Sequence, residues 1–420
     1  MLWITLLSFA VTAAAYGYPS QCPKVPEEPD NTKGPRGLCP TDFTIIGPQL
    51  EAVHESTNPP TGLAVDNDLN IYITYPRNDA PTPLNVVIAT SFTTEEPWPS
   101  AEIQNCTAGQ DVRDCFINVQ NVVLDSIGQM WIVDSGIFPG NKSATPGGAK
   151  IISFNITTRE KIRTYTVPTP LLTNMTNCND VRINNTAGTG GFAFLTDESQ
   201  FGSIIAIDLD TGGVVKRLFN STFTKSDPGY VGVFDGDLIY KWNNGTSRGF
   251  LNTGSDGIAL ASGNVYWGVL SSRRFYFVSQ AILQDFSASD DEVLAAVQDP
   301  GQCGTEQAGF TADDKGRVYI LASEHNAIFY VDTQQSQVTM EVNGAPPGGS
   351  GPVPTENYVV KDLVRNAQIQ HADSAAILDG WLYFCTNQLE LKPDRQYMNV
   401  DRRKGPFRSY RVWIGAGPAV

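Results

Sequence analysis

The sequence is poor in the residues from which many metal and nucleotide sites are built. Only three of its 420 residues are histidines, His54, His325 and His371, so a metal site made of several histidines is excluded. No two cysteines are separated by just two residues, which argues against a zinc ribbon or a thioredoxin-type redox site. The sequence contains neither a Walker loop nor a dinucleotide-binding glycine fingerprint.

Charged residues are also scarce. They make up 17% of the chain, against roughly 25% in typical soluble domains. Acidic residues predominate and give a formal net charge of −15. Because an acidic surface repels phosphates and anionic lipids, we expect neither nucleic acid nor a membrane as a partner. The simplest interpretation is that the charge keeps the protein dissolved outside the cell.

Long hydrophobic runs are missing except at the start of the chain. Residues 1–15 read MLWITLLSFAVTAAA, an apolar stretch followed by three alanines. This order is typical of a secretory signal peptide with a small-residue cleavage site, although no Lys or Arg precedes the apolar stretch. The run is too short to span a membrane as a helix. We therefore predict a signal peptide over 1–15 and a secreted protein.

Glycosylation signals and cysteines agree with the secretory pathway. Seven Asn-x-Ser/Thr signals cluster in one part of the chain, at Asn105, Asn141, Asn155, Asn174, Asn184, Asn220 and Asn244. Seven cysteines are present, and an odd number leaves at least one outside any intrachain pairing.

The cysteine positions suggest a pairing scheme. Cys106 and Cys115 flank a short polar loop and are predicted to form a disulfide, whereas Cys385 lies in an apolar strand and is predicted to be a buried free thiol. By elimination, the remaining predicted pairs are Cys22–Cys39 and Cys178–Cys303, although six cysteines allow fifteen connectivities.

One sequence template recurs along the chain. It consists of an apolar run, a polar turn and a strand that carries an aromatic residue, and in three copies an aspartate precedes that aromatic by six positions. The six aromatic residues, at intervals of 53 to 72 residues, are Tyr72, Trp131, Phe194, Tyr266, Tyr319 and Tyr383. A second pair of alternating strands follows in most copies. Six units of four strands predict an all-β, six-bladed propeller with long loops.

The propeller is predicted to be one domain over residues 41–415, and we expect a monomer. One short helix is expected from the capping box Ser289–Glu292, with Pro300–Gly301 ending it. To close the ring, the two chain ends should share a blade, and residues 43–47 are predicted to pair with residues 409–415.

Four motifs resemble the major royal jelly protein and yellow family. They are QMWIVDSG at 129–136, GSDGIALASGNVYWGVL at 254–270, TNQLEL at 386–391 and GPFRSYRVWIGAGPA at 405–419. The resemblance covers nearly all of the chain after the signal peptide and implies a secreted six-bladed propeller. The family includes pigmentation proteins linked to dopachrome conversion, salivary proteins that bind biogenic amines, and storage proteins, so it implies a fold more firmly than an activity.

Polar residues stand just before the innermost strand of most units. In a propeller these positions converge on one mouth of the central channel, which predicts a ring of carboxylates and amides. The predicted ligand-binding residues are Asn121, Asp134, Asp180, Asp256, Gln307, His371, Asp373 and Asn387. The alternative interpretation is that each Asp or Asn only satisfies the backbone of a turn.

Three functions remain open. The leading prediction is that the mouth binds, or also converts, a small aromatic or amine-bearing ligand, with Trp131, Tyr266 or Phe384 available for cation–π contact. The first rival is a metal-dependent, lactonase-like hydrolase that uses Asp180, Asp256 and Asp373, the three carboxylates that this ring could offer to calcium. The second rival is a storage or interaction protein without a catalytic site. We predict no cofactor, with calcium as the alternative.

Overall fold

The computed structural model describes residues 45–78, 82–107, 109–338 and 349–419. Two compact units are distinguished, residues 1–45 and 46–420, and the strands and helices of the described residues belong to the second. The predicted signal peptide, Cys22, Cys39 and residues 43–44 lie outside the described residues.

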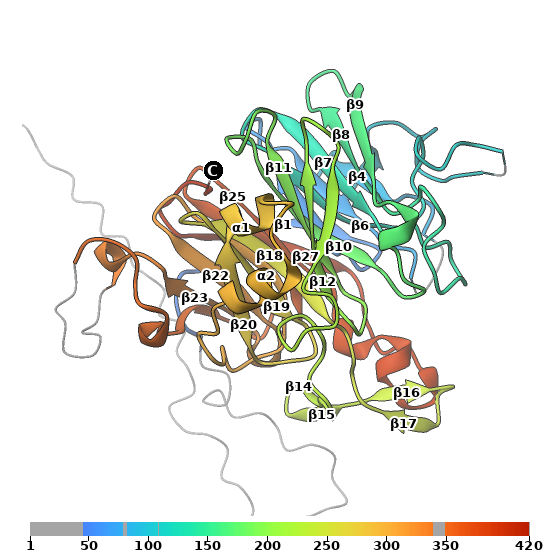
Figure 1. Ribbon diagram of the computed structural model, residues 1–420. Coiled ribbons are helices and arrows are strands. Elements are labelled where there is room, and N and C mark those ends of the chain that lie inside the picture. Colours follow the sequence, from blue (N-terminus) through green and yellow to red (C-terminus); the bar gives the residue numbers. More distant parts are fainter. Residues whose placement is uncertain (1–44, 79–81, 108, 339–348, 420) are drawn as a thin grey trace, which may run out of the picture. The chain divides into compact units, whose positions relative to one another are not determined.

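Six antiparallel sheets form the six blades of a propeller (Figure 1). Blade 1 consists of β2 (Gly62–Val65), β3 (Ile71–Thr74), β4 (Val86–Ala89) and β5 (Glu95–Pro97). Blade 2 consists of β6 (Val119–Leu124), β7 (Gln129–Asp134), β8 (Lys150–Asn155) and β9 (Lys161–Thr166). Blade 3 consists of β10 (Cys178–Asn184), β11 (Phe192–Asp197), β12 (Ser203–Asp208) and β13 (Val214–Arg217). Blade 4 consists of β18 (Ser255–Ala261), β19 (Asn264–Val269) and β20 (Phe275–Ser279). Blade 5 consists of β21 (Gln307–Ala312), β22 (Arg317–Ala322), β23 (Ala327–Asp332) and β24 (Lys361–Arg365). Blade 6 consists of β25 (Ala372–Leu378), β26 (Trp381–Thr386), β27 (Phe407–Trp413) and β1 (Glu51–Ser56).

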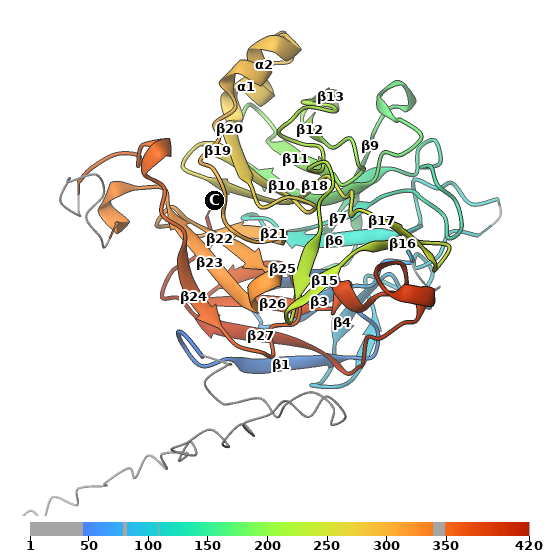
Figure 2. The same cartoon turned by 90° about the horizontal axis from the view of Figure 1, so that it is seen from below.

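The first strand of each blade lies nearest the middle of the propeller. In Figure 2 the strands β6, β10, β18, β21 and β25 converge there, and the later strands of each blade follow outward. Apolar side chains of neighbouring blades pack into shared clusters, as where Phe194 of blade 3 meets Trp267 of blade 4. The predicted fold class is therefore confirmed, and burial between blades supplies most of the core.

A recurring turn explains the six-residue offset between aspartate and aromatic. Oδ1 of the aspartate accepts the backbone N–H groups two and four residues later. Its Oδ2 accepts a side-chain hydrogen bond of 2.8 Å from the aromatic residue, and the pairs are Asp66–Tyr72, Asp125–Trp131 and Asp313–Tyr319. The offset is thus a structural device that fixes the turn between the first two strands of a blade.

The ring closes on blade 6, but with a different N-terminal strand from the predicted one. The outer partner of β27 is β1, and Ile46 instead pairs with Arg365 of β24 in blade 5. Oppositely charged residues face each other across β1 and β27: Glu51 lies opposite Arg411 and Glu55 opposite Arg408. Such cross-strand ion pairs favour this register, and the sequence of residues 43–47, FTIIG, has no acidic side chain that could form them.

Two short helices follow blade 4 where the sequence predicted one. The capping box is present at the start of α2 (Asp290–Ala296): the Ser289 hydroxyl accepts the Glu292 N–H, and the Glu292 carboxylate accepts the Ser289 N–H. The helix ends at Ala296, before the predicted stop at Pro300. A five-residue helix, α1 (Gln280–Gln284), precedes it with Ser279 as its N-cap.

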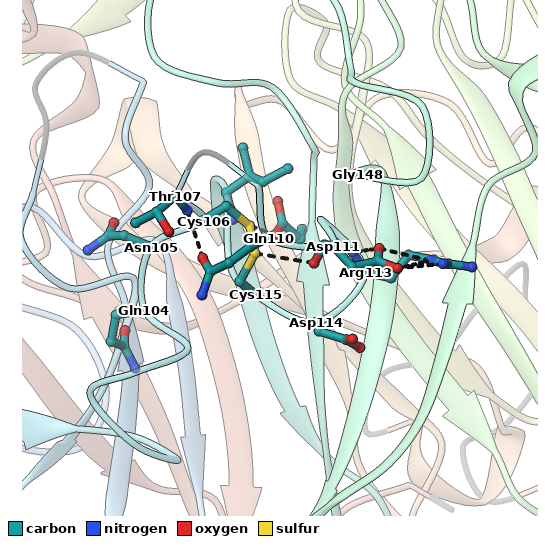
Figure 3. The surroundings of a disulfide bond; sticks show 12 residues. Gln104, Asn105, Cys106, Thr107, Gln110, Asp111, Arg113, Asp114, Cys115 and Gly148 are labelled. Carbon is teal, nitrogen blue, oxygen red and sulfur yellow. Dashed lines mark hydrogen bonds and ion pairs between the residues drawn. A yellow bond between two sulfur atoms is a disulfide. The ribbon is translucent and has the colours of Figure 1, made fainter.

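One predicted disulfide is confirmed and another is wrong. Cys106 and Cys115 are bonded across a nine-residue separation (Figure 3), and Cys385 is a buried free thiol as predicted. Cys178 and Cys303 are also free and buried. They cannot pair because Cys178 packs in the core between blades 2 and 3, whereas Cys303 packs between blades 4 and 5.

The glycosylation signals differ in exposure. Asn141, Asn174, Asn220 and Asn244 are exposed, whereas Asn105, Asn155 and Asn184 are half-buried. Neither helix in the described part of the chain is long and apolar enough to cross a membrane.

Candidate functional site

The same irregularity marks the start of the innermost strand in five blades. A β-bulge falls between Val119 and Asn121, and between the corresponding residues of β10, β18, β21 and β25. A bulge re-aims the side chains it contains and often lies beside a functional site. The repeated bulge therefore turns polar residues toward the channel at the same depth in successive blades.

The bulge register separates these residues into two layers. At each bulge, two successive residues of the inner strand face the channel. The first of the two lies in the outer layer, which we call the mouth, and the polar residues there are Gln120, Asn179, Asp256 and Asp373. The second lies in the layer below, which we call the waist, and the residues there are Asn121, Asp180, Gly257, Gly309 and Ser374. Asp180 thus lies one position further along its strand than Asp256 and Asp373, and the three carboxylates do not share one place in the repeat.

The waist is held together by hydrogen bonds between blades. Asn121 Nδ2 donates to Asp180 Oδ1 at 2.6 Å, and Ser374 Oγ donates to Asn121 Oδ1 at 3.2 Å. Arg182 donates to the same Asp180 oxygen at 2.6 Å and reaches the carbonyl oxygen of Phe310 in blade 5 at 2.5 Å. Asp180 is therefore bound within the packing of the propeller.

Glycines let the inner strands of blades 4, 5 and 6 approach at the waist. A Cβ on Gly257 would lie 2.6 Å from the Cα of Gly309, and one on Gly309 would lie 2.0 Å from the backbone oxygen of Asp373. Neither position has room for a side chain, so the waist closes by backbone contact on this side.

Asp256 is the most perturbed acid of the mouth. Its side chain is buried and accepts a hydrogen bond from the Asn179 amide of blade 3. Burial raises the pKa of Asp256 well above its usual range, and the nearby carboxylates of Glu198 and Asp373 raise it further. No basic side chain is among the main influences on this pKa, so the ionised form lacks compensation.

Two further acids lie within electrostatic reach of Asp256. Burial raises the pKa of Asp373 to about 6, against the opposing effect of His371, and its carboxylate accepts a hydrogen bond from Asn387. Burial also raises the pKa of Glu198 to about 7, with Lys392 opposing it and Asp373 adding to it. Protein surrounds both side chains, but each keeps part of its surface accessible to solvent. Solvent can thus reach this side of the mouth.

Two buried ion pairs line the other side of the mouth. Arg395 donates to Glu306 Oε1 at 2.8 Å, and the His371 Nδ1–Glu390 Oε1 distance is 2.6 Å. Burial raises the pKa of Glu306 despite Arg395. Burial alone would lower the pKa of His371, but the Glu390 carboxylate outweighs it and the pKa is raised.

Three buried polar atoms of these ion pairs have no hydrogen-bond partner among the described residues. They are Glu306 Oε2, Glu390 Oε2 and His371 Nε2. Buried polar groups in native proteins nearly always have a hydrogen-bond partner, so several unpaired polar atoms close together indicate the place of a water, ion or ligand. The side chains that carry these atoms and the acids Asp256, Asp373 and Glu198 influence each other's pKa values and form one electrostatic unit.

Two long connections cover this mouth, and we call them together the cap. The first, residues 218–254, carries β14 (Gly232–Phe234), β15 (Asp237–Ile239), β16 (Lys241–Asn243) and β17 (Ser247–Gly249); the second, residues 387–406, carries three short 3-10 turns and both Glu390 and Arg395. They meet through the rings of Trp242 and Tyr397, 5.0 Å apart, and through a 2.6 Å hydrogen bond from Met398 N to the Gly245 carbonyl.

Close approach of the cap to the mouth is visible at Gly232. A Cβ there would lie 2.7 Å from the orphaned Glu306 Oε2. The cap also contains the sequence Gly-Thr-Ser-Arg-Gly at 245–249, which has the spacing of a hydrolase nucleophile motif. Ser247 begins an exposed hairpin strand, not a strand-to-helix turn, so it forms no nucleophile elbow.

Several predicted residues lie at the mouth or waist, and two serve other roles. Asp134 is fully buried against the side of the channel wall, where it accepts three backbone N–H groups and pairs with Lys150 at 2.7 Å. Gln307 braces blade 4 against blade 5 through the carbonyl oxygens of Val269 and Arg274. Their polar groups are used by the fold.

The aromatic residues considered for cation–π contact are core residues. Trp131 donates to its turn aspartate, Tyr266 stacks on Phe277 with ring centroids 4.8 Å apart, and Phe384 is fully buried. The aromatic ring with an electrostatic link to the mouth is Tyr230 of the cap, whose pKa is raised by burial and by Glu306.

The donor set does not fit a metal ion. Among the described residues, no three His, Cys, Asp or Glu side chains are grouped so that they could hold one. Asp180, which would have to be a ligand, is already paired with Arg182. We therefore derive no step through a metal.

Comparison with known proteins gives one family and several distant structures. Residues 117–344 match the family model described as major royal jelly protein. Major royal jelly protein 5 of Apis mellifera is 24% identical over 228 residues, which cover 50% of this chain and 33% of that protein. The match thus spans about a third of the relative's length.

Similar solved structures are more remote in sequence. A luciferin-regenerating enzyme is 11% identical with a TM-score of 0.49, covering 89% of this chain and 98% of its own. Regucalcin, a calcium-binding protein of Agrobacterium tumefaciens, is 9% identical with a TM-score of 0.48, covering 90% and 96%. Virginiamycin B lyase of Staphylococcus aureus is 12% identical with a TM-score of 0.42, covering 89% and 100%. These values say nothing about ligand or reaction.

Proposed function

The chain belongs to the major royal jelly protein family, and on that premise we propose that it is a secreted protein that binds a small amine-bearing ligand at the mouth of its channel. The positively charged ammonium group is bound among Asp256, Asp373 and Glu198. An aromatic or other apolar body would extend beneath the cap. The Cys106–Cys115 disulfide supports an oxidising, extracellular compartment.

The observation that carries this proposal is an imbalance of charge among side chains that protein surrounds. Five carboxylates influence one another there: Glu198, Asp256, Glu306, Asp373 and Glu390. The basic groups that oppose them are Arg395, Lys392 and His371, and Lys392 also contacts Asp394. An added ammonium ion would let Asp256 and Asp373 ionise, and it would add charged donors to the neutral amides of Asn179 and Asn387.

The solvent-accessible side of the mouth gives the ligand a way in. Asp373, Glu198 and Asn179 keep partial exposure, while Glu306, Glu390 and His371 are buried behind them. An ammonium bound at Asp373 and Glu198 would donate to carboxylates whose pKa values burial raises despite His371 and Lys392. Binding should therefore release protons near neutral pH.

The test compares a cation with its uncharged equivalent. Binding of phenethylamine and of 2-phenylethanol, which differ in one group, is measured by isothermal titration calorimetry with wild type, Asp256→Asn and the control Asp210→Asn, an exposed turn residue. We expect the amine to bind more tightly than the alcohol to wild type and to the control. Asp256→Asn should lose tenfold to a hundredfold in amine affinity, the value of a charge-assisted contact of about 1.5–3 kcal/mol.

Three outcomes would overturn the proposal. Equal binding of amine and alcohol would show that the acids do not recognise charge. No binding of either, by a protein with a normal thermal transition, would favour a storage or interaction role. Metal in the purified protein, together with hydrolysis of a lactone that ceases on chelation, would favour the hydrolase.

A further inference from the structure

A cavity lies on the opposite side of the waist from the mouth. It has a volume of about 770 Å³ and is lined by the far ends of the inner strands and by Pro418 near the C-terminal end of the described chain. Its wall is about equally polar and apolar, and the apolar part includes Val123, Leu260, Ala312 and Ala376. Its volume falls within the roughly 300–1,000 Å³ of typical small-molecule sites.

One basic side chain, Arg182, lies in this cavity's wall directly below the waist. Its side chain keeps 12% exposure and donates three hydrogen bonds, to Asp180 Oδ1, to the Val181 carbonyl and to the Phe310 carbonyl. A guanidinium carries five N–H groups, so in the part of the chain that the structure describes two remain for a ligand. These contacts fix the group in place before any ligand binds.

Two of the three acidic residues of the cavity wall, Asp66 and Asp125, are already occupied within the protein, and the third, Asp68, is exposed to solvent. Oδ1 of Asp66 accepts two backbone N–H groups, and Oδ2 accepts Asn70 and the Tyr72 hydroxyl. Asp125 is occupied by its turn and by Trp131. The second arginine of the lining, Arg159, lies at the exposed rim beside Glu96. Arg182 is therefore the arginine that is held beneath the waist and still has donors to spare.

We propose that this cavity is a binding site for a small apolar molecule that carries a single carboxylate, with the carboxylate on Arg182 and the apolar body along the inner strands. A guanidinium matches a carboxylate in geometry and can bind both of its oxygens. Asp180 lies on the other side of the guanidinium and offsets part of its charge, which favours a monoanion over a more highly charged phosphate.

The site is separate from the amine site of the mouth. The waist lies between them, and the two ligand classes have opposite charge. A ligand in this cavity therefore neither requires nor excludes the proposed function. Decanoate is a suitable probe, since it has one carboxylate and an apolar chain, and 1-decanol and decylamine serve as its uncharged and cationic equivalents.

The experiment measures binding of the three probes by calorimetry, below the concentrations at which they form micelles. Decanoate should bind wild type at least tenfold more tightly than 1-decanol, and any binding of decylamine, which the mouth acids would take, should not change in Arg182→Gln. Arg182→Gln should reduce decanoate affinity tenfold to a hundredfold and remove the preference over 1-decanol, whereas the exposed control Arg248→Gln should keep both.

A second variant guards against misfolding of Arg182→Gln, since that arginine also ties together blades 3 and 5. Ala376→Phe fills the cavity wall and leaves Arg182 intact, so it should weaken decanoate and 1-decanol together. Its control is Ala295→Phe on the exposed face of α2. Equal binding of decanoate and 1-decanol to wild type, or decanoate binding that survives Ala376→Phe, would overturn the proposal.

Discussion

Asn121 of blade 2 donates a hydrogen bond of 2.6 Å to Asp180 of blade 3, across the middle of the propeller. The same Asp180 oxygen accepts from Arg182, which lines the cavity on the far side. On the near side, burial raises the pKa values of Asp256 and Asp373, and the Asp180 carboxylate adds to both shifts. This one contact therefore lies between the acidic side chains of the mouth and the cavity that Arg182 lines.

Replacing Asn121 should destabilise the protein. Asn121→Ala removes the donor to Asp180 and the acceptor for both Val122 N and Ser374 Oγ. Leaving buried polar groups unsatisfied costs about 1–3 kcal/mol, so the midpoint of urea unfolding should fall. The exposed Asn243→Ala should change it little. Identical midpoints for the two variants would show that the waist does not contribute to stability.

The aspartate–aromatic turn should contribute equally in different blades. Tyr72→Phe and Tyr319→Phe each remove one hydrogen bond of 2.8 Å to a carboxylate, and bonds to charged groups contribute about 1.5–3 kcal/mol. Tyr266→Phe removes a bond between two neutral hydroxyls, Tyr266 and Tyr358, and should cost less. Thermal unfolding of the three variants tests this order, and a larger loss for Tyr266→Phe would contradict it.

The repeat was readable from sequence because three blades make the same turn between their first two strands. The six-residue offset that revealed the units is the hydrogen bond between aspartate and aromatic, as in Asp125 and Trp131. Closure was harder to predict because it depends on a contact between chain ends. Its register follows from charge pairs such as Glu51–Arg411, which local patterns do not display.

The candidate site was only partly predictable for a similar reason. Asp256 and Asp373 stand at repeated bulges, so their position in the unit reveals them. Glu198, Glu390 and Arg395 lie in connections of unequal length, where no repeat signals a shared location. The sequence motif TNQLEL did contain Glu390, but nothing local showed that it would reach His371.

Asp134 was predicted to bind a ligand, but its side chain is already paired with a lysine inside the protein. Its buried contact with Lys150 at 2.7 Å joins the adjacent strands β7 and β8, and in blade 3 the corresponding Asp197 of β11 pairs with Lys216 of β13, two strands away, at 3.1 Å. Lys150→Met should cost about 3–5 kcal/mol, because Asp134 would remain as an uncompensated buried charge. Urea unfolding measures the loss.

A surface pair supplies the control for Lys150→Met. Arg113 and Asp111 form an exposed ion pair beside the disulfide (Figure 3). Exposed pairs contribute about 0–1 kcal/mol, so Arg113→Met should have a small effect. A loss for Lys150→Met no greater than that for Arg113→Met would show that the buried pair is not needed for stability.

The mouth acids should make stability fall as pH rises toward neutrality. The pKa of Glu198 is about 7 in the folded chain against 4.5 for an ordinary glutamate, and that of Asp373 is about 6 against 3.8. A carboxyl with a raised pKa binds its proton more tightly in the folded state. The contribution of such a carboxyl to folding stability is therefore fully present at pH values below its pKa in the unfolded chain. That contribution is lost as the pH rises from about 4 to 7. Partial exposure of both side chains reduces the size of the effect.

Thermal unfolding between pH 4.5 and 8 tests this dependence. Glu198→Gln should flatten the decline above pH 5, while the exposed Glu356→Gln in the β23–β24 connection should leave it unchanged. Saturating phenethylamine should stabilise wild type more at pH 8 than at pH 5, because an ammonium ion binds the ionised acids and native-state binding raises stability. Equal stabilisation at both pH values would show that the amine does not bind at these carboxylates.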